Sequence, residues 1–208
     1  MAKERLKSPR ARLFVALDLP DPVRAGLVAW QREALGDPAL RMIPPEALHV
    51  TLCFLAYQPE SAIERIAQVV CGIEPHPVTL RFRREPIAAP RGRPRLFALD
   101  APSDEADALQ GELSSRLQAE RFYKPEKRPF WSHVTVARVK SEKRTPSERR
   151  GRRRGRPTLV SRPPPGLPDE LLEPFAAPRV TLYRSLLRPA GAEYAPLTAL
   201  DLPSDAED

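Results

Sequence analysis

Two copies of one tripeptide bring together residue types that could carry out acid–base chemistry. Residues 49–51 (HVT) begin the run HVTLCFL, and residues 133–135 (HVT) begin the run HVTVARV. Side chains in an extended strand alternate between its two faces, so each tripeptide presents an imidazole and a hydroxyl on one face. Apolar residues fill the other face. Two such strands, brought together, would place two histidines and two hydroxyl groups around one small cavity.

This set of side chains suits the cleavage of a phosphodiester at neutral pH. An imidazole with an ordinary pKa near 6.5 can accept a proton from water, while a second, protonated imidazole donates a proton to the departing oxygen. Threonine hydroxyls can donate hydrogen bonds to the non-bridging oxygens, where charge accumulates in the transition state. We therefore predict that His49 and His133 are catalytic and that Thr51 and Thr135 bind the phosphate.

Metal ligation is the alternative use of two histidines. It would need a third ligand, and neither tripeptide has a second histidine or a carboxylate at a spacing seen in metal sites. We therefore expect no metal and no cofactor. The third histidine, His76, lies between two prolines and outside any repeat. We expect it in a surface turn.

The elements that must position the tripeptides repeat along the chain. Residues 12–20 (RLFVALDLP) and 95–102 (RLFALDAP) read as strands that share Ala-Leu-Asp-x-Pro, and apolar residues at helical spacing follow each of them. The shared aspartate precedes the next HVT histidine by 31 residues in the first copy and by 33 in the second. This predicts two β-α-β units related by a pseudo-two-fold axis. We interpret Asp18 and Asp100 as turn-forming residues at the strand ends.

Positive charge is concentrated in one segment of the 208-residue chain. Ten Lys/Arg and two Glu lie between Arg138 and Arg156, while the chain as a whole has a net charge of +7, so the remainder is close to neutral. The segment at about 141–170 is rich in arginine and proline and cannot bury enough apolar surface to fold alone. We expect a flexible insert there. It is either a solvated linker or an electrostatic guide for RNA, because clustered arginines neutralise phosphates.

The compartment is predicted from the cysteines and from the lack of long apolar runs. Cys53 and Cys71 are the only cysteines and form no Cys-x-x-Cys, so a disulfide or a zinc site is not expected. No run of roughly 18 apolar residues could span a bilayer, and the N-terminal residues lead into no apolar signal segment. We expect a cytoplasmic protein that makes no contact with a membrane.

The runs around the two tripeptides resemble the bacterial RNA 2′,3′-cyclic phosphodiesterases, also called 2′-5′ RNA ligases, of the two-histidine phosphoesterase superfamily. The resemblance covers nearly the whole chain and rests on FVALDLP (14–20), PPEALHVTLCFL (44–55), RPFWSHVTVARV (128–139) and LYRSLLRPAGAEYAPL (182–197). It implies an α+β fold with two pseudo-symmetric β-α-β lobes, whose antiparallel sheets face a central groove. The domain would span residues 1–208, and the protein would act as a monomer.

The same resemblance implies roles for single residues. His49 matches the proton donor and His133 the proton acceptor, although the sequence alone does not say which histidine is acid and which is base. Arg138 matches the arginine of an HxTxxR signature and is implied to contact the phosphate. Strict strand alternation would instead turn it to the opposite face, unless a bulge or the strand end intervenes. Phe14 matches an aromatic position that either borders the base or packs in the core.

Two residues depart from the family pattern, and three activities stay open. Ser132 stands where proline is usual before the second tripeptide, and Ala56 where glycine is usual after the first strand. The family implies metal-free hydrolysis of a terminal 2′,3′-cyclic phosphate to a 2′-phosphate, with RNA 3′ ends or nucleotides as partners. The alternatives are 2′-5′ RNA ligation by the reverse reaction and a non-catalytic nucleotide- or RNA-binding module. The presence of both histidines favours an enzyme.

Overall fold

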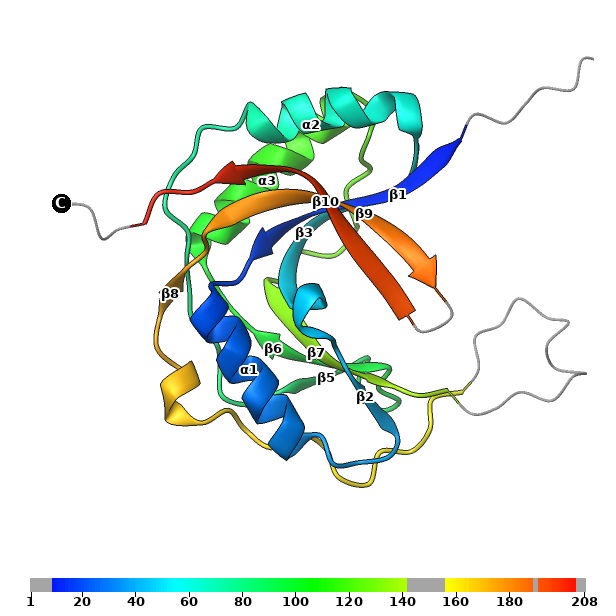
Figure 1. Ribbon diagram of the computed structural model, residues 1–208, viewed down its shortest axis with the longest axis vertical. Coiled ribbons are helices and arrows are strands. Elements are labelled where there is room, and N and C mark those ends of the chain that lie inside the picture. The colour runs from blue at the N-terminus through cyan, green and yellow to red at the C-terminus, as the bar shows by residue number, and fades with distance from the viewer. Residues whose placement is uncertain (1–8, 142–155, 189–190, 205–208) are drawn as a thin grey trace, which may run out of the picture.

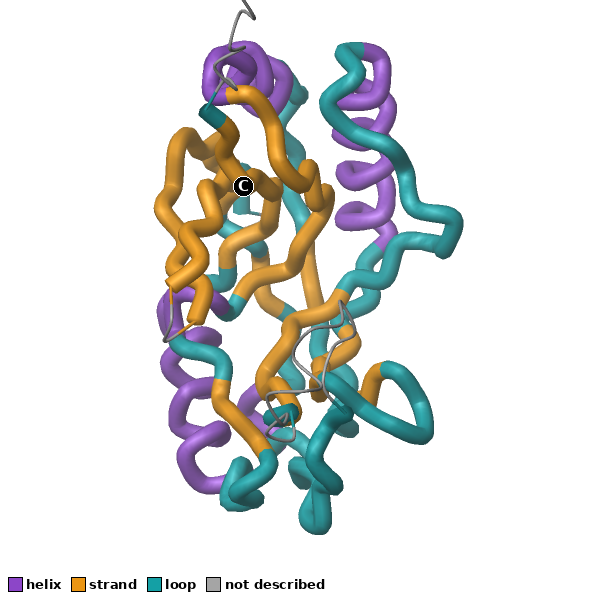
Figure 2. Tube along the Cα trace, turned by 90° about the vertical axis from the view of Figure 1, so that its right-hand side faces the viewer, coloured by secondary structure: helices purple, strands orange, loops and turns teal. Residues whose placement is uncertain are grey.

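The computed structural model describes residues 9–141, 156–188 and 191–204, which form an antiparallel sheet with helices on its outside (Figure 1). In the view turned by 90°, the helices again lie outside the strands (Figure 2). The elements, in chain order, are β1 (Arg10–Asp18), α1 (Asp21–Ala34), β2 (Leu40–Met42), η1 (Pro45–Ala47), β3 (His49–Pro59), η2 (Glu60–Ala62), α2 (Ile63–Cys71), β4 (Thr79–Leu80), β5 (Ile87–Ala89), β6 (Leu96–Asp100), α3 (Asp104–Ala119), β7 (His133–Val139), η4 (Asp169–Leu171), β8 (Phe175–Ala176), β9 (Arg179–Arg188) and β10 (Gly191–Asp201).

The strand order explains how the two HVT runs meet. The large sheet follows the order β10-β9-β1-β3-β7-β6-β5, with β2 also paired to β7, and β4 and β8 form a small second sheet. Every pairing between these strands is antiparallel. The strands that carry the two tripeptides, β3 and β7, are therefore neighbours at the centre of the large sheet. The predicted α+β class with antiparallel sheets is confirmed.

The register shows the internal repeat directly. In each half, the aspartate that ends the first strand lies opposite the histidine of the HVT run, and the alanine two residues earlier lies opposite the threonine. The halves join where Val50 of β3 pairs with Val134 of β7. The central valines of the two tripeptides thus lie on the pseudo-two-fold axis.

Each HVT strand carries a β-bulge immediately after its threonine. The register skips Leu52 in β3 and Val136 in β7. An extra residue shifts the alternation of side chains, so the residue three positions after the threonine shares the face of the histidine and threonine. That residue is Phe54 in β3 and Arg138 in β7. The bulge is why Arg138 does not point away from the site, as strict alternation would require.

The helices pack on the sheet through apolar residues at helical spacing. α3 begins at Ser103, whose Oγ accepts a hydrogen bond from the backbone N–H of Ala106 at 3.1 Å, and its buried residues are Ala106, Leu109, Leu113 and Leu117. The buried Gln31 of α1 donates to the carbonyl of Val136 at 2.7 Å, which ties α1 to β7. No helix in the described ranges is long and apolar enough to cross a membrane.

Sequence analysis did not predict β10, although it forms one edge of the sheet. β10 pairs with β9 along its length, with a shift in register between Pro196 and Thr198. Proline within a run argues against a central strand, but it is tolerated in an edge strand, where a backbone donor can be spared. Tyr194, which this strand carries, therefore reaches the site described below from a segment that was not expected to be a strand.

The basic segment at about 141–170, predicted to be a flexible insert, is described only in part. Residues 142–155 lie outside the described residues, so the prediction for them stands as made. Beyond them, the carboxylate of Asp37 accepts hydrogen bonds from the backbone N–H of Ser161 at 2.8 Å and of Arg162 at 2.7 Å. Hydrogen bonds to this carboxylate, led by that from Arg162, lower the pKa of Asp37 to about 2. Leu167 is buried, so this stretch is anchored to the body of the protein.

Candidate active site

All six residues predicted for the site line one pocket with a volume of about 150 Å³. They come from three adjacent strands: β1, β3 and β7. The walls consist of Arg12, Phe14, Ile43, Ala47, His49, Thr51, Phe54, His133, Thr135, Arg138 and Tyr194. Two imidazoles, two hydroxyls and a guanidinium thus surround a space of limited volume. In the described part of the chain, no three His, Cys, Asp or Glu side chains are placed to hold a metal ion.

The valine pair at the centre of the sheet fixes how the histidines face each other. Val50 and Val134 are fully buried, so the residues on either side of them point to the opposite face, toward the pocket. The antiparallel register sets each histidine beside the threonine of the other strand. The two histidines are then diagonal neighbours, which lie about 7–8 Å apart in an antiparallel pair. One phosphate group fits between two imidazoles at that separation.

His133 is held by one hydrogen bond and one ring. Its Nδ1 lies 2.6 Å from the carbonyl oxygen of Trp131, and since a carbonyl only accepts, Nδ1 carries the proton and Nε2 is left for the pocket. The Trp131 ring stacks on the imidazole at 4.0 Å with an interplanar angle of 15°. Burial lowers the pKa of His133, while the Trp131 carbonyl and the negative charge of Asp100 oppose that effect.

His49 has different surroundings. Phe14 stacks on its ring at 4.9 Å, and Tyr194 approaches it edge-on at 5.5 Å. None of the described residues hydrogen-bonds the imidazole. Burial, followed by the positive charges of His133, Arg24 and Arg138, lowers the pKa of His49 to about 4. The ring is therefore neutral at pH 7 until an anion enters the pocket.

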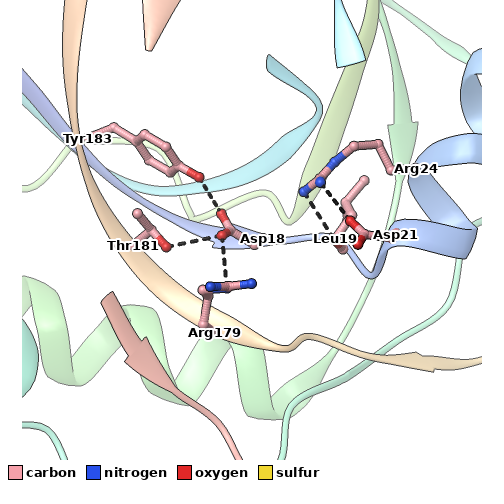
Figure 3. Close-up of polar contacts among 7 residues, drawn as sticks. All are labelled: Asp18, Leu19, Asp21, Arg24, Arg179, Thr181 and Tyr183. Atoms are coloured by element: carbon pink, nitrogen blue, oxygen red, sulfur yellow. Dashed lines mark hydrogen bonds and ion pairs between the residues drawn. The ribbon is translucent and has the colours of Figure 1, made fainter. Parts of the chain in front are cut away.

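Behind Phe14, a buried carboxylate organises the wall of the pocket (Figure 3). Asp18 accepts hydrogen bonds from the hydroxyls of Tyr183 at 2.7 Å and of Thr181 at 3.1 Å, and Arg179 approaches the same carboxylate at 3.4 Å. Burial and the neighbouring carboxylate raise the pKa of Tyr183. The Tyr183 ring stacks on Phe14 at 5.2 Å, so the network supports the ring that contacts His49.

Asp18 and Asp100 do more than form turns, which corrects the sequence interpretation. Each ends its strand, as predicted, but each carboxylate accepts a hydrogen bond from an aromatic side chain near the histidine of its own half. For Asp100 the donor is Nε1 of Trp131, at 2.9 Å. For Asp18 the donor is Tyr183, which acts through Phe14. The alignment of the two aspartates in the internal repeat was the signal that could have indicated a shared role.

Phe14 has a packing position in the structure. Its side chain is only 4% exposed, and it stacks on His49 and on Tyr183. The base contact suggested for Phe14 stays a prediction. Arg138, by contrast, is exposed along the pocket wall and is available to an anion.

Three wall residues were not singled out from the sequence. Arg12 donates to Oγ of Ser185 at 2.9 Å and lies over the Phe54 ring, 4.7 Å from its centroid. Tyr194 comes from the unpredicted edge strand. Phe54 could have been found by aligning HVTLCF with HVTVAR, since it occupies the position of Arg138.

Both departures from the family pattern fall where the backbone or the packing is unfavourable. Ala56 has φ of 57°, a left-handed conformation in which the Cβ of an L-residue is strained and glycine is not. The hydroxyl of Ser132 is buried and has no hydrogen-bond partner among the described residues. Neither residue lines the pocket.

Comparisons with known proteins agree with this geometry. A family model described as the 2′-5′ RNA ligase superfamily matches residues 19–159. The RNA 2′,3′-cyclic phosphodiesterase of Thermus thermophilus is 30% identical over 142 residues, covering 62% of this chain and 69% of that protein. The protein of the same name from Escherichia coli is 25% identical over 186 residues, covering 89% and 93%. A crystal structure of another Thermus thermophilus chain, described as TT0787, superposes with a TM-score of 0.72 at 25% identity, covering 93% of this chain and 99% of that one.

Proposed function

The chain belongs to the 2′-5′ RNA ligase superfamily, and we propose that it hydrolyses terminal 2′,3′-cyclic phosphates of RNA or nucleotides to 2′-phosphomonoesters. The observation that carries this proposal is the convergence of two histidines and two threonines on one pocket. Relatives named RNA 2′,3′-cyclic phosphodiesterase, at 23–30% identity, support the same reaction.

In the proposed reaction, His133 is the proton acceptor and His49 the proton donor. Nε2 of His133 takes a proton from water, the water oxygen bonds to phosphorus, and the bond from phosphorus to the ribose 3′ oxygen breaks as His49 protonates that oxygen. The products are a 2′-phosphate and a free 3′ hydroxyl. The Trp131 carbonyl at Nδ1 and the nearby Asp100 favour the positive charge that develops on His133, which supports its assignment as the base.

The assignment of His49 as the acid depends on the bound phosphate. Positive charges near His49 favour release of its proton, so a protonated His49 is a strong donor. The negative phosphate raises the pKa of His49 again, because an opposite charge favours the charged form of the imidazole. Binding of the substrate thus loads the acid with the proton that it delivers.

We assign Thr51, Thr135 and Arg138 to the phosphate. The threonine hydroxyls flank the two histidines, and the bulge in β7 brings the guanidinium to the same face. Hydrogen-bond donors that face the non-bridging oxygens stabilise charge where it grows in the transition state. We further infer that the enzyme acts as a metal-independent monomer in the cytoplasm. The free thiols of Cys53 and Cys71 fit a reducing compartment.

Product analysis tests the proposal. An oligonucleotide that ends in a 2′,3′-cyclic phosphate is incubated with the protein in EDTA, and the product is identified by ³¹P NMR. A 2′-phosphate end is expected. A 3′-phosphate end, no turnover, or activity that requires added zinc or manganese would contradict the proposal.

The family description also supports the reverse reaction as a second candidate. Ligation of a cyclic phosphate to a 5′ hydroxyl would use the same two histidines with their roles exchanged. An oligonucleotide with a free 5′ hydroxyl, added in excess, would then give a product with a 2′-5′ junction. A protein that binds the cyclic end but gives neither product would be the non-catalytic module.

A further inference from the structure

A second, larger cavity adjoins the histidine pocket. It has a volume of about 450 Å³, against about 150 Å³ for the pocket, and Thr51, Phe54 and His133 line both. Sites that enclose a drug-sized organic molecule have volumes of about 300–1,000 Å³. The pocket is therefore sized for a phosphate group, and a nucleotide bound there must extend into the adjoining space. We call this second cavity the α3 groove; its other walls include Gln110, Ser114, Tyr123, Phe130 and Trp131.

The α3 groove has aromatic walls next to the reacting groups. Trp131 stacks on His133 and also lines the groove, so it joins the catalytic pocket to the groove. Phe54, Tyr123 and Phe130 contribute three further rings. Unpaired nucleobases are bound by stacking on such side chains. Phe14, on the other side of the pocket, is buried between His49 and Tyr183, which makes it a poorer surface for a base.

Two polar side chains of α3 line the same groove. Gln110 and Ser114 are four residues apart and so lie on one face of the helix. The Gln110 side chain hydrogen-bonds Cys53, whose pKa is raised to about 12 by burial, so the thiol stays neutral. A carboxamide has two N–H donors and an acceptor oxygen, and one contact to a thiol leaves further groups for a ligand. Aromatic faces and a polar edge together match the two recognition features of a nucleobase.

We propose that the α3 groove binds the nucleobase of the reacting end, and that Gln110 and Ser114 determine which base is preferred. This inference rests on the proposed function, since it places the base relative to the phosphate between the histidines. It names specificity-determining residues on a helix that carries none of the catalytic groups.

The test compares substrates with and without a base. We would measure kcat/KM for the four 2′,3′-cyclic mononucleotides and for glycerol 1,2-cyclic phosphate, which has the reacting ring but no base. For the unaltered protein we expect a preference among the bases, and a kcat/KM for the best nucleotide about 5- to 150-fold above that for the glycerol compound, the range that stacking of one base supplies.

The variants Gln110→Glu and Ser114→Ala then test the polar edge. Gln110→Glu replaces the amide donors by an acceptor with little change in shape, so the ranking of the four bases should change, by about tenfold or more for at least one pair. Ser114→Ala should narrow the preference. Ser115→Ala is the matched control, because Ser115 is the next residue, is exposed, and donates to the carbonyl of Gly111 at 2.9 Å. It should leave the ranking as it is.

The outcomes separate this inference from the proposed function. Equal kcat/KM for all four nucleotides and the glycerol compound would overturn the base site while the hydrolase assignment stands. A ranking that both α3 variants leave unchanged, with thermal unfolding showing them folded, would overturn the roles of Gln110 and Ser114. Failure of the unaltered protein to hydrolyse any cyclic phosphate would overturn the proposed function itself.

Discussion

The two halves of the sheet share one backbone plan but surround their histidines with opposite charges. In each half an aspartate pairs with the histidine across the strands, a bulge follows the threonine, and an aromatic ring packs on the imidazole. Around His49, the charges that act on the ring are those of Arg24, Arg138 and His133. Around His133, the acting groups are the carboxylate of Asp100 and a backbone carbonyl.

The difference shows how a repeated unit can supply two unlike catalytic groups. Duplication accounts for the geometry, because the same register places both histidines on one face of the sheet. Divergence of a few neighbours then separates their proton affinities. The clearest pair is Phe54 and Arg138, which occupy equivalent positions after the two bulges, so that one half presents a ring and the other a cation.

Removing either histidine should give the largest effect. We expect His49→Ala and His133→Ala each to lower cyclic phosphate hydrolysis by about 10²- to 10⁴-fold without loss of folding. The pH profiles should differ in direction. His133→Ala keeps the acid, which must be protonated, so its residual activity falls as pH rises. His49→Ala keeps the base, which must be neutral, so its residual activity rises with pH. Profiles with these slopes exchanged would reverse the assignment.

Replacing Arg138 should affect both the phosphate and His49. Loss of one donor to a developing anion costs about 10²- to 10³-fold in rate, and we expect Arg138→Gln to fall in that range. Because the Arg138 charge lowers the pKa of His49, its removal should raise that pKa, measured by NMR titration of the imidazole. Phe54→Leu, at the equivalent position, removes no charge and should leave the pKa of His49 in place. Equal shifts in both variants would contradict the charge argument.

The aspartates offer a more subtle test of the difference between the halves. Asp100→Asn keeps an acceptor for Trp131 but removes the negative charge that raises the pKa of His133, so that pKa should fall. Asp18 is not among the groups that shift the pKa of His49, so Asp18→Asn should not change it. NMR titration of both imidazoles in each variant gives the comparison. A fall in the pKa of His49 in Asp18→Asn, matching that of His133, would show that the halves are electrostatically alike.

The smallest effect concerns stability at one end of β3. Ala56→Gly should raise the free energy of unfolding by about 1 kcal/mol, because the left-handed conformation at φ of 57° strains alanine. Lys140 holds the equivalent position in the second half and has no positive φ, so Lys140→Gly should lower stability. Urea unfolding of the two variants checks the pair, and kcat should stay unchanged in Ala56→Gly. A loss of stability in Ala56→Gly would show that the strain is relieved elsewhere.

The sequence by itself determined the candidate catalytic pair, the internal repeat and the antiparallel α+β class. These follow from local rules: side chains alternate along a strand, so His-x-Thr has a predictable face, and a repeated order of strand and helix predicts a repeated unit. Family resemblance added Arg138, against the local rule. Its face depends on the bulge at Val136, which is defined only by the pairing of β7 with β6.

Only the tertiary structure decided which other residues complete the site. The hydrogen bond from Tyr183 to Asp18 joins residues 165 positions apart, and Tyr194 reaches His49 from an edge strand that contains proline. The α3 groove forms because a helix after β6 packs beside β3 of the other half. Local patterns cannot encode such contacts, because they arise when distant segments meet in the packed sheet. The unequal proton affinities of the two histidines have the same origin, since they depend on burial and on charges brought together by folding.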